Sequence, residues 1–483
     1  MRSDLSMLMD LYEMTMSNGI LQSDMRDKIT YFDMFFRRVP DKGGYAIMAG
    51  LEQLIEYFNN LHFDDSDIDY LCSLGLFCDE FLDYLRNFKF ECDVWAVPEG
   101  TPIFPMEPIV TVRGPAIQAF LVETMVLLTV NHQSLIATKA NRICSVAGDR
   151  AVMEFGARRA HGYDAAYYGA RAAIIGGCLG TSNVMTAKDF GVIASGTMAH
   201  SWVQLYEDEY TAFKTYAERY PDSCTLLIDT YNVLKSGLPN AIKCFDEVLK
   251  PRGFRPKGVR IDSGDIAYLS KKIRKKLDDA GYPDCAIVVS NSLDEHLIKE
   301  LDNQGAKINS FGVGERLITA SSEAVFGGVY KLAAVEDKDG NIIPKIKISE
   351  NIAKITLPGV KIPWRLYDNE TGKAIADVIC MNYEKIDDTK PYEIFDPVHT
   401  WKRKTVTNFT AKKLQIKIME KGKQVYTSPS VKEISSFRKD CVDHLWEEVK
   451  RFENPHAYYV DLSQELWDLR QKLLSEKSEG ENA

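Results

Sequence analysis

Short apolar runs recur through the middle of the chain, and a polar or helical segment separates each from the next. Eight such runs lie between about residues 150 and 335: Ala151–Phe155, Ala172–Cys178, Phe190–Ser195, Cys224–Asp229, Gly258–Asp262, Ala286–Ser290, Ile308–Gly312 and Val329–Val335. Some of these runs are apolar on both faces, which is typical of strands in a parallel sheet covered by helices. Eight repeats favour a closed α/β barrel, and a doubly wound open sheet is the alternative.

The flanking segments have other patterns. Residues 1–130 are predicted to form an α+β domain with a helix over Leu5–Asn18 and strands at Ile29–Arg37, Glu91–Ala96 and Ile109–Arg113. A helix over Glu123–Val146 leads into the barrel domain, residues 131–345. We expect residues 346–483 to pack on the N-terminal domain; the pattern predicts strand or turn at Lys345–Ser349 and Leu357–Lys361, then helices over Val431–Phe452 and Leu462–Leu474.

The composition of the chain argues against nucleic acid and membrane as partners. The chain has 483 residues, with 69 acidic against 59 basic side chains and no long Lys/Arg run, so it lacks the charge pattern of a nucleic-acid binder. The longest apolar stretch, Ile117–Val130, is interrupted by polar residues, so we expect no membrane span. Ten cysteines without a Cys-x-x-Cys pair argue against a zinc site or a disulfide framework, and favour a reducing cytoplasm.

Polar segments follow seven of the predicted strands in turn. They begin with Phe155-Gly156-Ala157-Arg158-Arg159, Gly180-Thr181-Ser182-Asn183 and Gly196-Thr197-Met198-Ala199-His200-Ser201, and continue with Asp229-Thr230-Tyr231-Asn232, Asp262-Ser263-Gly264-Asp265, Ser290-Asn291-Ser292 and Gly312-Val313-Gly314. Because ligands of such folds bind at the carboxyl ends of the strands, we expect these segments to build one site.

The segment Gly258–Asp265 carries the most specific chemistry. At the strand period of two, Arg260 and Asp262 point to the same face. Asp262 can accept hydrogen bonds from ribose hydroxyls, Ser263 and the backbone at Gly264 can donate to phosphate, and Arg260 can bind an anion or stack on a ring. The alternative is a strand-end ion pair followed by the N-cap of a helix over Ile266–Leu277.

His200 is a candidate general base or nucleophile, with Asp229 fixing its tautomer; alternatively it is a hydrogen-bonded histidine without chemistry. The backbone of Gly312-Val313-Gly314 can bind phosphate, and we expect the neighbouring Glu315 to turn away or to meet magnesium. Phe155 and Tyr12 are candidates to sandwich a flat ring. Of the adjacent Arg158 and Arg159, we expect one to face the ligand.

Several ordered motifs resemble nicotinate phosphoribosyltransferases. They are Asp-Leu-Tyr ending at Tyr12, Phe-Gly-Ala-Arg-Arg-Ala from Phe155, Gly-Thr-Met-Ala-His-Ser ending at Ser201, Asp-Thr-Tyr from Asp229, Gly-Val-Arg-Ile-Asp-Ser-Gly-Asp from Gly258 and Gly-Gly-Val-Tyr-Lys-Leu from Gly327. The resemblance covers about Leu5 to Arg365 and extends more loosely to the C-terminal helices.

The resemblance implies an irregular (β/α) barrel of the type II phosphoribosyltransferases, in a homodimer with a shared active site. The implied reaction makes nicotinate mononucleotide and pyrophosphate from nicotinate and phosphoribosyl pyrophosphate, for NAD salvage. In that family the histidine matching His200 is phosphorylated by ATP, and Mg²⁺ is bound with the pyrophosphate, with no protein metal ligand assigned here. Residues matching Tyr12, Thr197 and Arg260 meet nicotinate, and Tyr12 reaches across the dimer.

The remaining binding residues are expectations of the same kind. For nicotinate these are Phe155, Arg158 and Ser182, and for phosphoribosyl pyrophosphate they are Asp262, Ser263, Gly264, Ser290, Asn291, Gly312, Gly314, Lys331, Lys347 and Arg37. The cations among them suit a pyrophosphate leaving group, although a solvated strand face is the alternative for Lys345 and Lys347. Asn232 stands where some relatives have a second acid, so no magnesium role is carried over to that position.

Three other functions stay open. A nicotinamide-using relative has an aspartate at the position of Ser182, and a hydroxyl there favours the acid substrate because a carboxylate would repel it. A phosphate-binding barrel without catalysis is the second alternative, and His200, Asp229, Arg260 and Asp262 argue against it. The third is an aldolase-like barrel, for which Lys331 is the candidate Schiff-base lysine.

Overall fold

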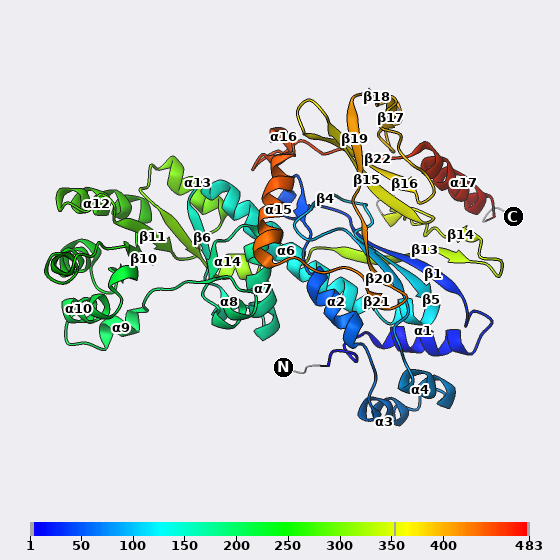
Figure 1. Cartoon of the computed structure of the whole chain (residues 1–483), viewed down its shortest axis with the longest axis horizontal. Helices are drawn as coiled ribbons and strands as arrows, with labels where there is room; N and C mark the ends of the chain where they lie inside the picture. Colours follow the sequence, from blue (N-terminus) through cyan, green and yellow to red (C-terminus); the bar gives the residue numbers. More distant parts are fainter. Residues whose placement is uncertain (1–3, 352–353, 481–483) are drawn as a thin grey trace. The chain divides into compact units, whose positions relative to one another are not determined.

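The structure is a computed structural model and describes residues 4–351 and 354–480 (Figure 1). The chain divides into two compact units, Met1–Leu135 with Val325–Ala483, and Ile136–Ala324. The N-terminal and C-terminal parts of the chain thus share one unit, and the other unit is formed by the middle of the chain.

The middle unit contains a seven-stranded parallel sheet in the order β8-β7-β6-β12-β11-β10-β9. Its strands are β6 (Ala151–Glu154), β7 (Gly180–Thr181), β8 (Ile193–Ala194), β9 (Thr225–Leu227), β10 (Gly258–Ile261), β11 (Ala286–Ser290) and β12 (Ser310–Val313). Strands that follow each other in the chain are neighbours except at one place, and β12 pairs back onto β6 as in a (β/α) barrel. Among the described residues no pairing joins β8 to β9, so the barrel is open there.

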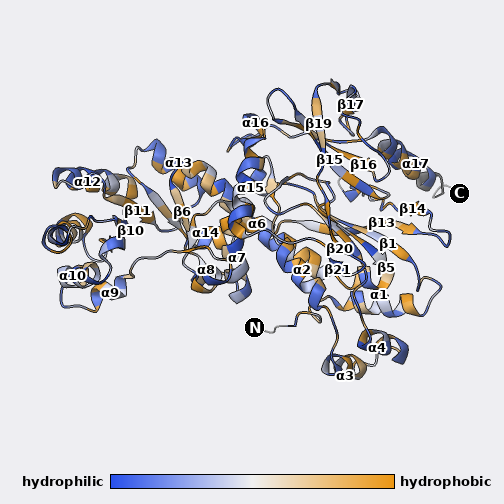
Figure 2. Cartoon of the chain, viewed as in Figure 1, coloured by the Kyte–Doolittle hydropathy of each residue, from blue (hydrophilic) through white to orange (hydrophobic). Residues whose placement is uncertain are grey.

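Helices connect these strands. They are α7 (Tyr163–Gly176), α8 (Val184–Asp189), α9 (His200–Gln204), α10 (Glu209–Arg219), α11 (Leu238–Cys244), α12 (Ile266–Asp279), α13 (Glu295–Asn303) and α14 (Glu315–Ile318). Helix α12 shows why the sequence folds this way: Asp265 caps it by accepting from the Tyr268 N–H, and Ile266, Ile273 and Leu277 are buried along one side. Its lysine-rich side is blue in Figure 2.

The other unit is built on a seven-stranded sheet in the order β14-β13-β1-β5-β3-β20-β21. These strands are β14 (Ile342–Pro344), β13 (Gly328–Glu336), β1 (Ile29–Phe36), β5 (Val110–Pro115), β3 (Asp93–Ala96), β20 (Ile416–Glu420) and β21 (Lys423–Gln424). A four-stranded sheet contains β19 (Phe409–Lys413), β15 (Lys361–Asp368), β16 (Ala374–Met381) and β22 (Val460–Leu462). Two small pairs complete the strands, β17 (Tyr392–Phe395) with β18 (Arg403–Val406), and β2 (Ala46–Ile47) with β4 (Pro102–Ile103).

Helices of the same unit include α1 (Leu11–Leu21), α2 (Leu51–Asn60), α3 (Asp65–Ser73), α4 (Asp79–Arg86), α5 (Ala116–Phe120), α15 (Val431–Asp443), α16 (Glu447–Lys450) and α17 (Gln464–Gly480). The long α6 (Glu123–Ala147) runs on into the middle unit. The stretch Ala116–Ala147 is the one candidate membrane span among the described residues, and 67% of its most apolar window is buried, as in the core helix of a globular fold.

A buried ion pair lies in the four-stranded sheet. The guanidinium of Arg365 donates to both carboxylate oxygens of Asp377 at 2.8 and 2.6 Å, and the two residues are 1% and 0% exposed. The Tyr458 hydroxyl donates to Asp377 at 2.9 Å. Each of these buried charges depends on the other, because no water is available to stabilise one of them if its partner is removed.

The predicted α/β barrel class is confirmed, whereas the predicted closure is wrong. Seven strands form the open barrel, and Val329–Val335 lies instead in β13, which pairs antiparallel with β1. The predicted strand Ala172–Cys178 is wrong, because this alanine-rich run falls largely in helix α7, which is followed by Gly177 with a φ of 120°. The strand that follows, β7, has only two residues and therefore too little pattern to be recognised.

Three corrections concern the flanking elements. The first helix begins at Leu11 rather than Leu5, and Lys345–Ser349 is not a strand, so its two lysines do not alternate on a strand face. The predicted helix Val431–Phe452 is two helices, α15 and α16, because the chain turns at His444–Trp446. Neither glycine nor proline marks that turn.

Candidate functional site

The carboxyl ends of the parallel strands surround a cavity of about 380 Å³. Since parallel strands point the same way, their following loops meet at one edge of the sheet. The residues that line the cavity are Phe155, Arg158, Arg159, Ser182, Gly196, Thr197, Met198, Ala199, His200, Leu227, Arg260, Asp262, Ser290, Asn291, Ser292, Gly312, Gly314 and Glu315.

His200 begins helix α9 and faces two carboxylates. Its Nε2 lies 4.0 Å from Asp229 Oδ1 and 3.8 Å from Asp262 Oδ2, while its Nδ1 lies 3.1 Å from the hydroxyl oxygen of Thr230. The Asp229 side chain is 1% exposed, and its Oδ1 is buried without a hydrogen-bond partner. A buried carboxylate oxygen beside an imidazole stabilises a proton on the near nitrogen, so this arrangement suits a histidine that gains positive charge.

The second oxygen of Asp229 ties the next loop in place. Asp229 Oδ2 accepts from the Asp262 N–H at 2.8 Å and from the Ser263 hydroxyl at 2.6 Å. The Ser263 hydroxyl is therefore bonded within the protein, and neither Ser263 nor Gly264 is among the residues that line the cavity. Gly264 has a φ of 84°, which glycine adopts without strain.

Arg260 is a fixed cation on the cavity wall. Its Nε donates to the Ser290 hydroxyl at 2.9 Å, and its Nη1 donates to the Thr197 hydroxyl at 3.0 Å. Its Nη2 lies 3.3 Å from Asp262 Oδ1, which also accepts from Ser290 at 2.5 Å. These bonds join the ends of β10 and β11 to the loop before α9, so the guanidinium is placed by three loops at once.

Backbone geometry makes room at the ends of the neighbouring strands β11 and β12. A Cβ on Gly312 would lie 2.5 Å from the Phe155 ring, so only glycine fits there. Asn291 and Ser292 have φ values of 106° and 44°, which non-glycine residues rarely adopt. The Ser292 hydroxyl donates to Glu315 at 3.1 Å, which ties this strained turn to the start of α14.

The structure brings most of the predicted site residues together. Eleven of them line the cavity: Phe155, Arg158, Ser182, Thr197, His200, Arg260, Asp262, Ser290, Asn291, Gly312 and Gly314. Arg159 lines it beside Arg158. Both arginines border the cavity, and the expectation that one of them faces the ligand stays a prediction. Sequence reasoning did not single out Thr230 or Glu154; Thr230 lies in the quoted Asp-Thr-Tyr motif, but its contact with His200 joins two distant loops.

Four predicted residues, Tyr12, Arg37, Lys331 and Lys347, belong to the other unit. There, burial and then the nearby Glu123 raise the pKa of Tyr12 to about 12. Burial lowers the pKa of Lys331, with the positive charges of Lys347 and Arg37 acting in the same direction, and Lys331 Nζ lies 4.0 Å from Glu123 Oε1. These residues therefore form a cationic group beside Tyr12.

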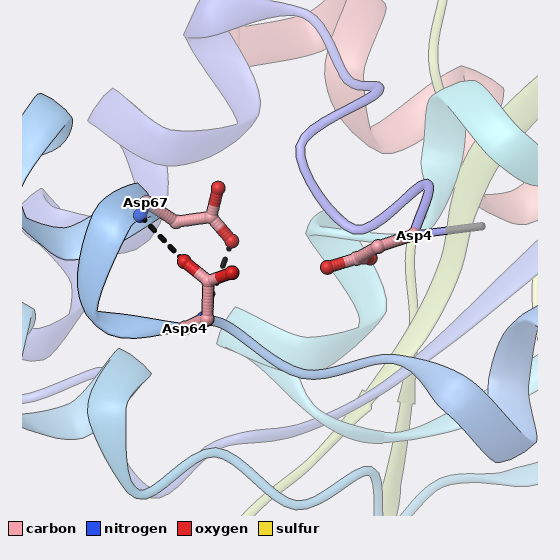
Figure 3. Close-up of side chains that lie close together, drawn as sticks. All are labelled: Asp4, Asp64 and Asp67. Carbon is pink, nitrogen blue, oxygen red and sulfur yellow. Dashed lines mark hydrogen bonds between the residues drawn. The ribbon is translucent and has the colours of Figure 1, made fainter. Parts of the chain in front are cut away.

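An acidic group elsewhere is explained by helix capping. Asp64 accepts from the Asp67 N–H at 2.9 Å, and Asp67 accepts from the Asp64 N–H at 3.2 Å, which caps α3 reciprocally, while Asp4 lies opposite (Figure 3). His62 Nε2 lies 3.7 Å from Asp4. These contacts account for the cluster without a metal ion.

Three family profiles together match almost the whole chain. The nicotinate phosphoribosyltransferase N-terminal domain matches residues 7–131, the nicotinate phosphoribosyltransferase family matches residues 150–379, and the C-terminal domain matches residues 360–470. The nicotinate phosphoribosyltransferase of Bacillus subtilis is 46% identical over 472 residues, covering 98% of this chain and 96% of that protein. The chain belongs to the nicotinate phosphoribosyltransferase family.

Other relatives are similar over their full lengths. The nicotinate phosphoribosyltransferase of Homo sapiens is 30% identical, covering 98% of this chain and 97% of that protein. The crystal structure of human nicotinic acid phosphoribosyltransferase superimposes with a TM-score of 0.84 at 28% identity, covering 96% of this chain and 99% of that one. The residues that line the cavity, His200 among them, all lie within residues 150–379, which the family profile matches.

Proposed function

We propose that this protein transfers the phosphoribosyl group of phosphoribosyl pyrophosphate to nicotinate, coupled to ATP hydrolysis, in NAD salvage. The observation that carries the proposal is the imidazole of His200 at the cavity wall, between the carboxylates of Asp229 and Asp262. The similarity to full-length nicotinate phosphoribosyltransferases supports the substrates. The nicotinamide-using and non-catalytic alternatives are outcomes of the test below.

His200 is the proposed phosphoryl acceptor. A ring nitrogen attacks the γ-phosphorus of ATP, a P–N bond forms, and the P–O bond to ADP breaks. The Asp229 carboxylate, with one buried oxygen facing Nε2, stabilises the positive charge that the ring then carries. Water later cleaves the P–N bond and releases phosphate, which makes the cycle downhill in the direction of mononucleotide synthesis.

In the transfer step, the bond from ribose C1 to the pyrophosphate oxygen breaks and C1 bonds to the pyridine nitrogen. Positive charge develops on the ribose, so a fixed carboxylate such as Asp262 is favourable beside it. Mg²⁺ held with the pyrophosphate would supply positive charge that offsets the charge of the leaving group. The donor chemistry fits this ion at Asp262, which lines the cavity and whose carboxylate is a hard oxygen ligand that would hold Mg²⁺ there.

Nicotinate is proposed to bind between Phe155 and a tyrosine, with Arg158, Ser182, Thr197 and Arg260 around its carboxylate. The ribose and phosphates are assigned to the cavity-lining residues Asp262, Ser290, Asn291, Gly312 and Gly314, while Ser263 and Gly264 support the loop behind Asp262. A hydroxyl at Ser182 donates to a carboxylate, which supports nicotinate over nicotinamide.

A homodimer is proposed to complete the site. The tyrosine, Tyr12, and the cations Arg37, Lys331 and Lys347 lie in the unit that does not form the cavity, and we propose that a second copy supplies them. Helix α1 and the residues before it expose Leu8, Leu11, Tyr12 and Met16, and the middle unit exposes Leu179, Val184, Met185 and Ile193. Such apolar surfaces suit a contact between subunits. All ten cysteines are free thiols, which supports a cytoplasmic location.

The test measures mononucleotide formation from phosphoribosyl pyrophosphate and Mg²⁺ with nicotinate or nicotinamide, each with and without ATP. Wild type should use nicotinate and be stimulated by ATP, and His200→Ala should lose the stimulation together with labelling by ATP carrying a radioactive γ-phosphate. The exposed His399 gives the matched control, His399→Ala, which should behave as wild type. Preference for nicotinamide would overturn the substrate assignment, and no turnover of either would overturn catalysis.

A further inference from the structure

Glu154 is a carboxylate buried beneath the cavity. It is the last residue of β6 and pairs with Val313 of β12 on one side and with Thr181 of β7 on the other. The residue is 0% exposed. None of the ion pairs found within residues 4–351 and 354–480 involves it. A buried carboxylate without a cation is unfavourable, and a strand end can be packed at lower cost by an apolar residue.

The two oxygens of Glu154 bind the loops on its two sides. Oε1 accepts from the N–H of Gly156, and Oε2 accepts from the Thr181 hydroxyl at 2.6 Å. The Thr181 oxygen in turn accepts from the N–H of Asn183 at 2.9 Å. A single side chain therefore connects the loop that carries Phe155 to the loop that carries Ser182.

The contact between Gly156 and Glu154 is closely packed. A Cβ on Gly156 would lie 2.5 Å from Ile318 and 2.8 Å from Glu154 Oε1, so the loop passes directly over the carboxylate. The Gly156 carbonyl then accepts from the Arg159 N–H at 2.7 Å and starts the turn that carries the two cavity arginines. The position of that turn thus depends on where the Gly156 N–H is anchored.

The second contact acts on the other wall in the same way. The Ser182 N–H donates to the Glu154 carbonyl at 2.9 Å, and the Asn183 side chain caps α8 by accepting from the Thr186 N–H at 3.3 Å. Ser182 is held between these two anchors. The backbone bond from Ser182 to the Glu154 carbonyl fixes the start of this loop. The Thr181 hydroxyl, which accepts from the Asn183 N–H, fixes its end.

We infer that Glu154 is a positioning residue: its carboxylate sets the spacing between the Phe155–Arg159 loop and the Thr181–Asn183 loop, and hence the part of the cavity that receives the substrate's aromatic carboxylate. This inference rests on the proposed function for the identity of that substrate. It assigns Glu154 no contact with any ligand.

The substitution Glu154→Gln tests this role, because glutamine keeps the volume but has only one oxygen to accept hydrogen bonds. Either Gly156 or Thr181 then loses its acceptor, and a buried donor without a partner weakens what it positions. We expect the KM for nicotinate to rise about tenfold or more, with the KM for phosphoribosyl pyrophosphate and ATP hydrolysis changed less than about twofold. The exposed Glu218, in the same unit, gives the matched control Glu218→Gln.

Two threonine variants separate the branches. Thr181→Val removes the hydroxyl and should raise the nicotinate KM, while Thr181→Ser keeps the hydroxyl and should restore it. Because both residues act through one chain of bonds, the double variant Glu154→Gln with Thr181→Val should be little worse than Glu154→Gln alone. A purely structural role predicts instead that all kinetic constants and the thermal midpoint deteriorate together.

Hydrogen–deuterium exchange gives a readout without turnover. In Glu154→Gln the amides of residues 155–160 and 181–184 should exchange faster, with the rest of the middle unit unchanged. Unchanged exchange in both segments, or an equal rise in the KM for both substrates, would overturn the inference. Absence of turnover in wild type would instead overturn the proposed function. In that case the exchange result alone would test whether Glu154 positions the two loops.

Discussion

Glu13, on α1 next to Tyr12, is predicted to lower the stability of the fold as the pH rises. The residue is 0% exposed; its Oε1 accepts from the N–H and the hydroxyl of Thr124, and its Oε2 has no hydrogen-bond partner. The Tyr57 hydroxyl is likewise buried without a partner. Burial, opposed by the Thr124 bonds and aided by Glu123, raises the pKa of Glu13 from 4.5 to about 7.

The sign and size of the effect follow from this pKa. Between pH 4.5 and about 7 the folded protein keeps the proton while the unfolded chain has released it, so stability falls as the pH rises and levels off above 7. Each tenfold change in proton affinity is worth about 1.4 kcal/mol, so the full loss is about 3 kcal/mol. About 2 kcal/mol of it falls between pH 5.5 and pH 8.

Glu13→Gln isolates this contribution. The amide cannot ionise, its oxygen can keep the Thr124 bonds, and its NH₂ replaces the unpartnered oxygen, where it can donate. We expect the difference in unfolding free energy between variant and wild type to move in favour of the variant by about 2 kcal/mol from pH 5.5 to pH 8.

Urea unfolding followed by tryptophan fluorescence at four pH values between these limits would measure that difference. Comparing the two proteins at the same pH cancels the other titrating groups. The exposed Glu56 on α2 gives the control Glu56→Gln, whose difference from wild type should not depend on pH. A difference for Glu13→Gln that is constant across the range would refute the reasoning.

Two further predictions concern assembly and the core. If the site is shared between subunits, co-expressing Tyr12→Ala with His200→Ala should restore ATP-stimulated activity to about a quarter of wild type. Half of the dimers then contain one subunit of each variant, and each mixed dimer has one intact site. Activity no higher than the mean of the two separate variants would contradict sharing. Asp377→Asn should destabilise by about 3–5 kcal/mol, because Arg365 stays buried with a weakened partner; a change below about 1 kcal/mol in urea unfolding would count against it.

The strands with a full repeat of apolar residues could be predicted from the sequence. β10 and β11 lie where the pattern placed them, and the period of two correctly put Arg260 beside Asp262, at 3.3 Å. β8, also only two residues long, lies inside the predicted run Phe190–Ser195. β7 could not be found in this way, because it has two residues and its hydrogen-bonded neighbours decide its conformation. The Ala172–Cys178 run was misassigned because a buried helix and a buried strand both read as continuous apolar sequence.

Within the site, loops after strands could be predicted and contacts between loops could not. His200, Asp229 and Asp262 stand out as polar residues after apolar runs, and the barrel order brings them within 4.0 Å. The bonds from Thr230 to His200 and from Thr181 to Glu154 join segments about 30 residues apart, and no local pattern marks them. Glu154 also ends its strand inside the core, where an acid is not expected.

The open seam of the barrel has a mechanical consequence. His200 follows β8 and Asp229 follows β9, the two strands at the ends of the parallel sheet, which do not pair with each other in the described chain. Elsewhere in the barrel, separating two adjacent catalytic loops requires stretching backbone hydrogen bonds between their strands. Across this seam the imidazole and the carboxylate can move apart and return together, and no strand pairing is broken in either direction.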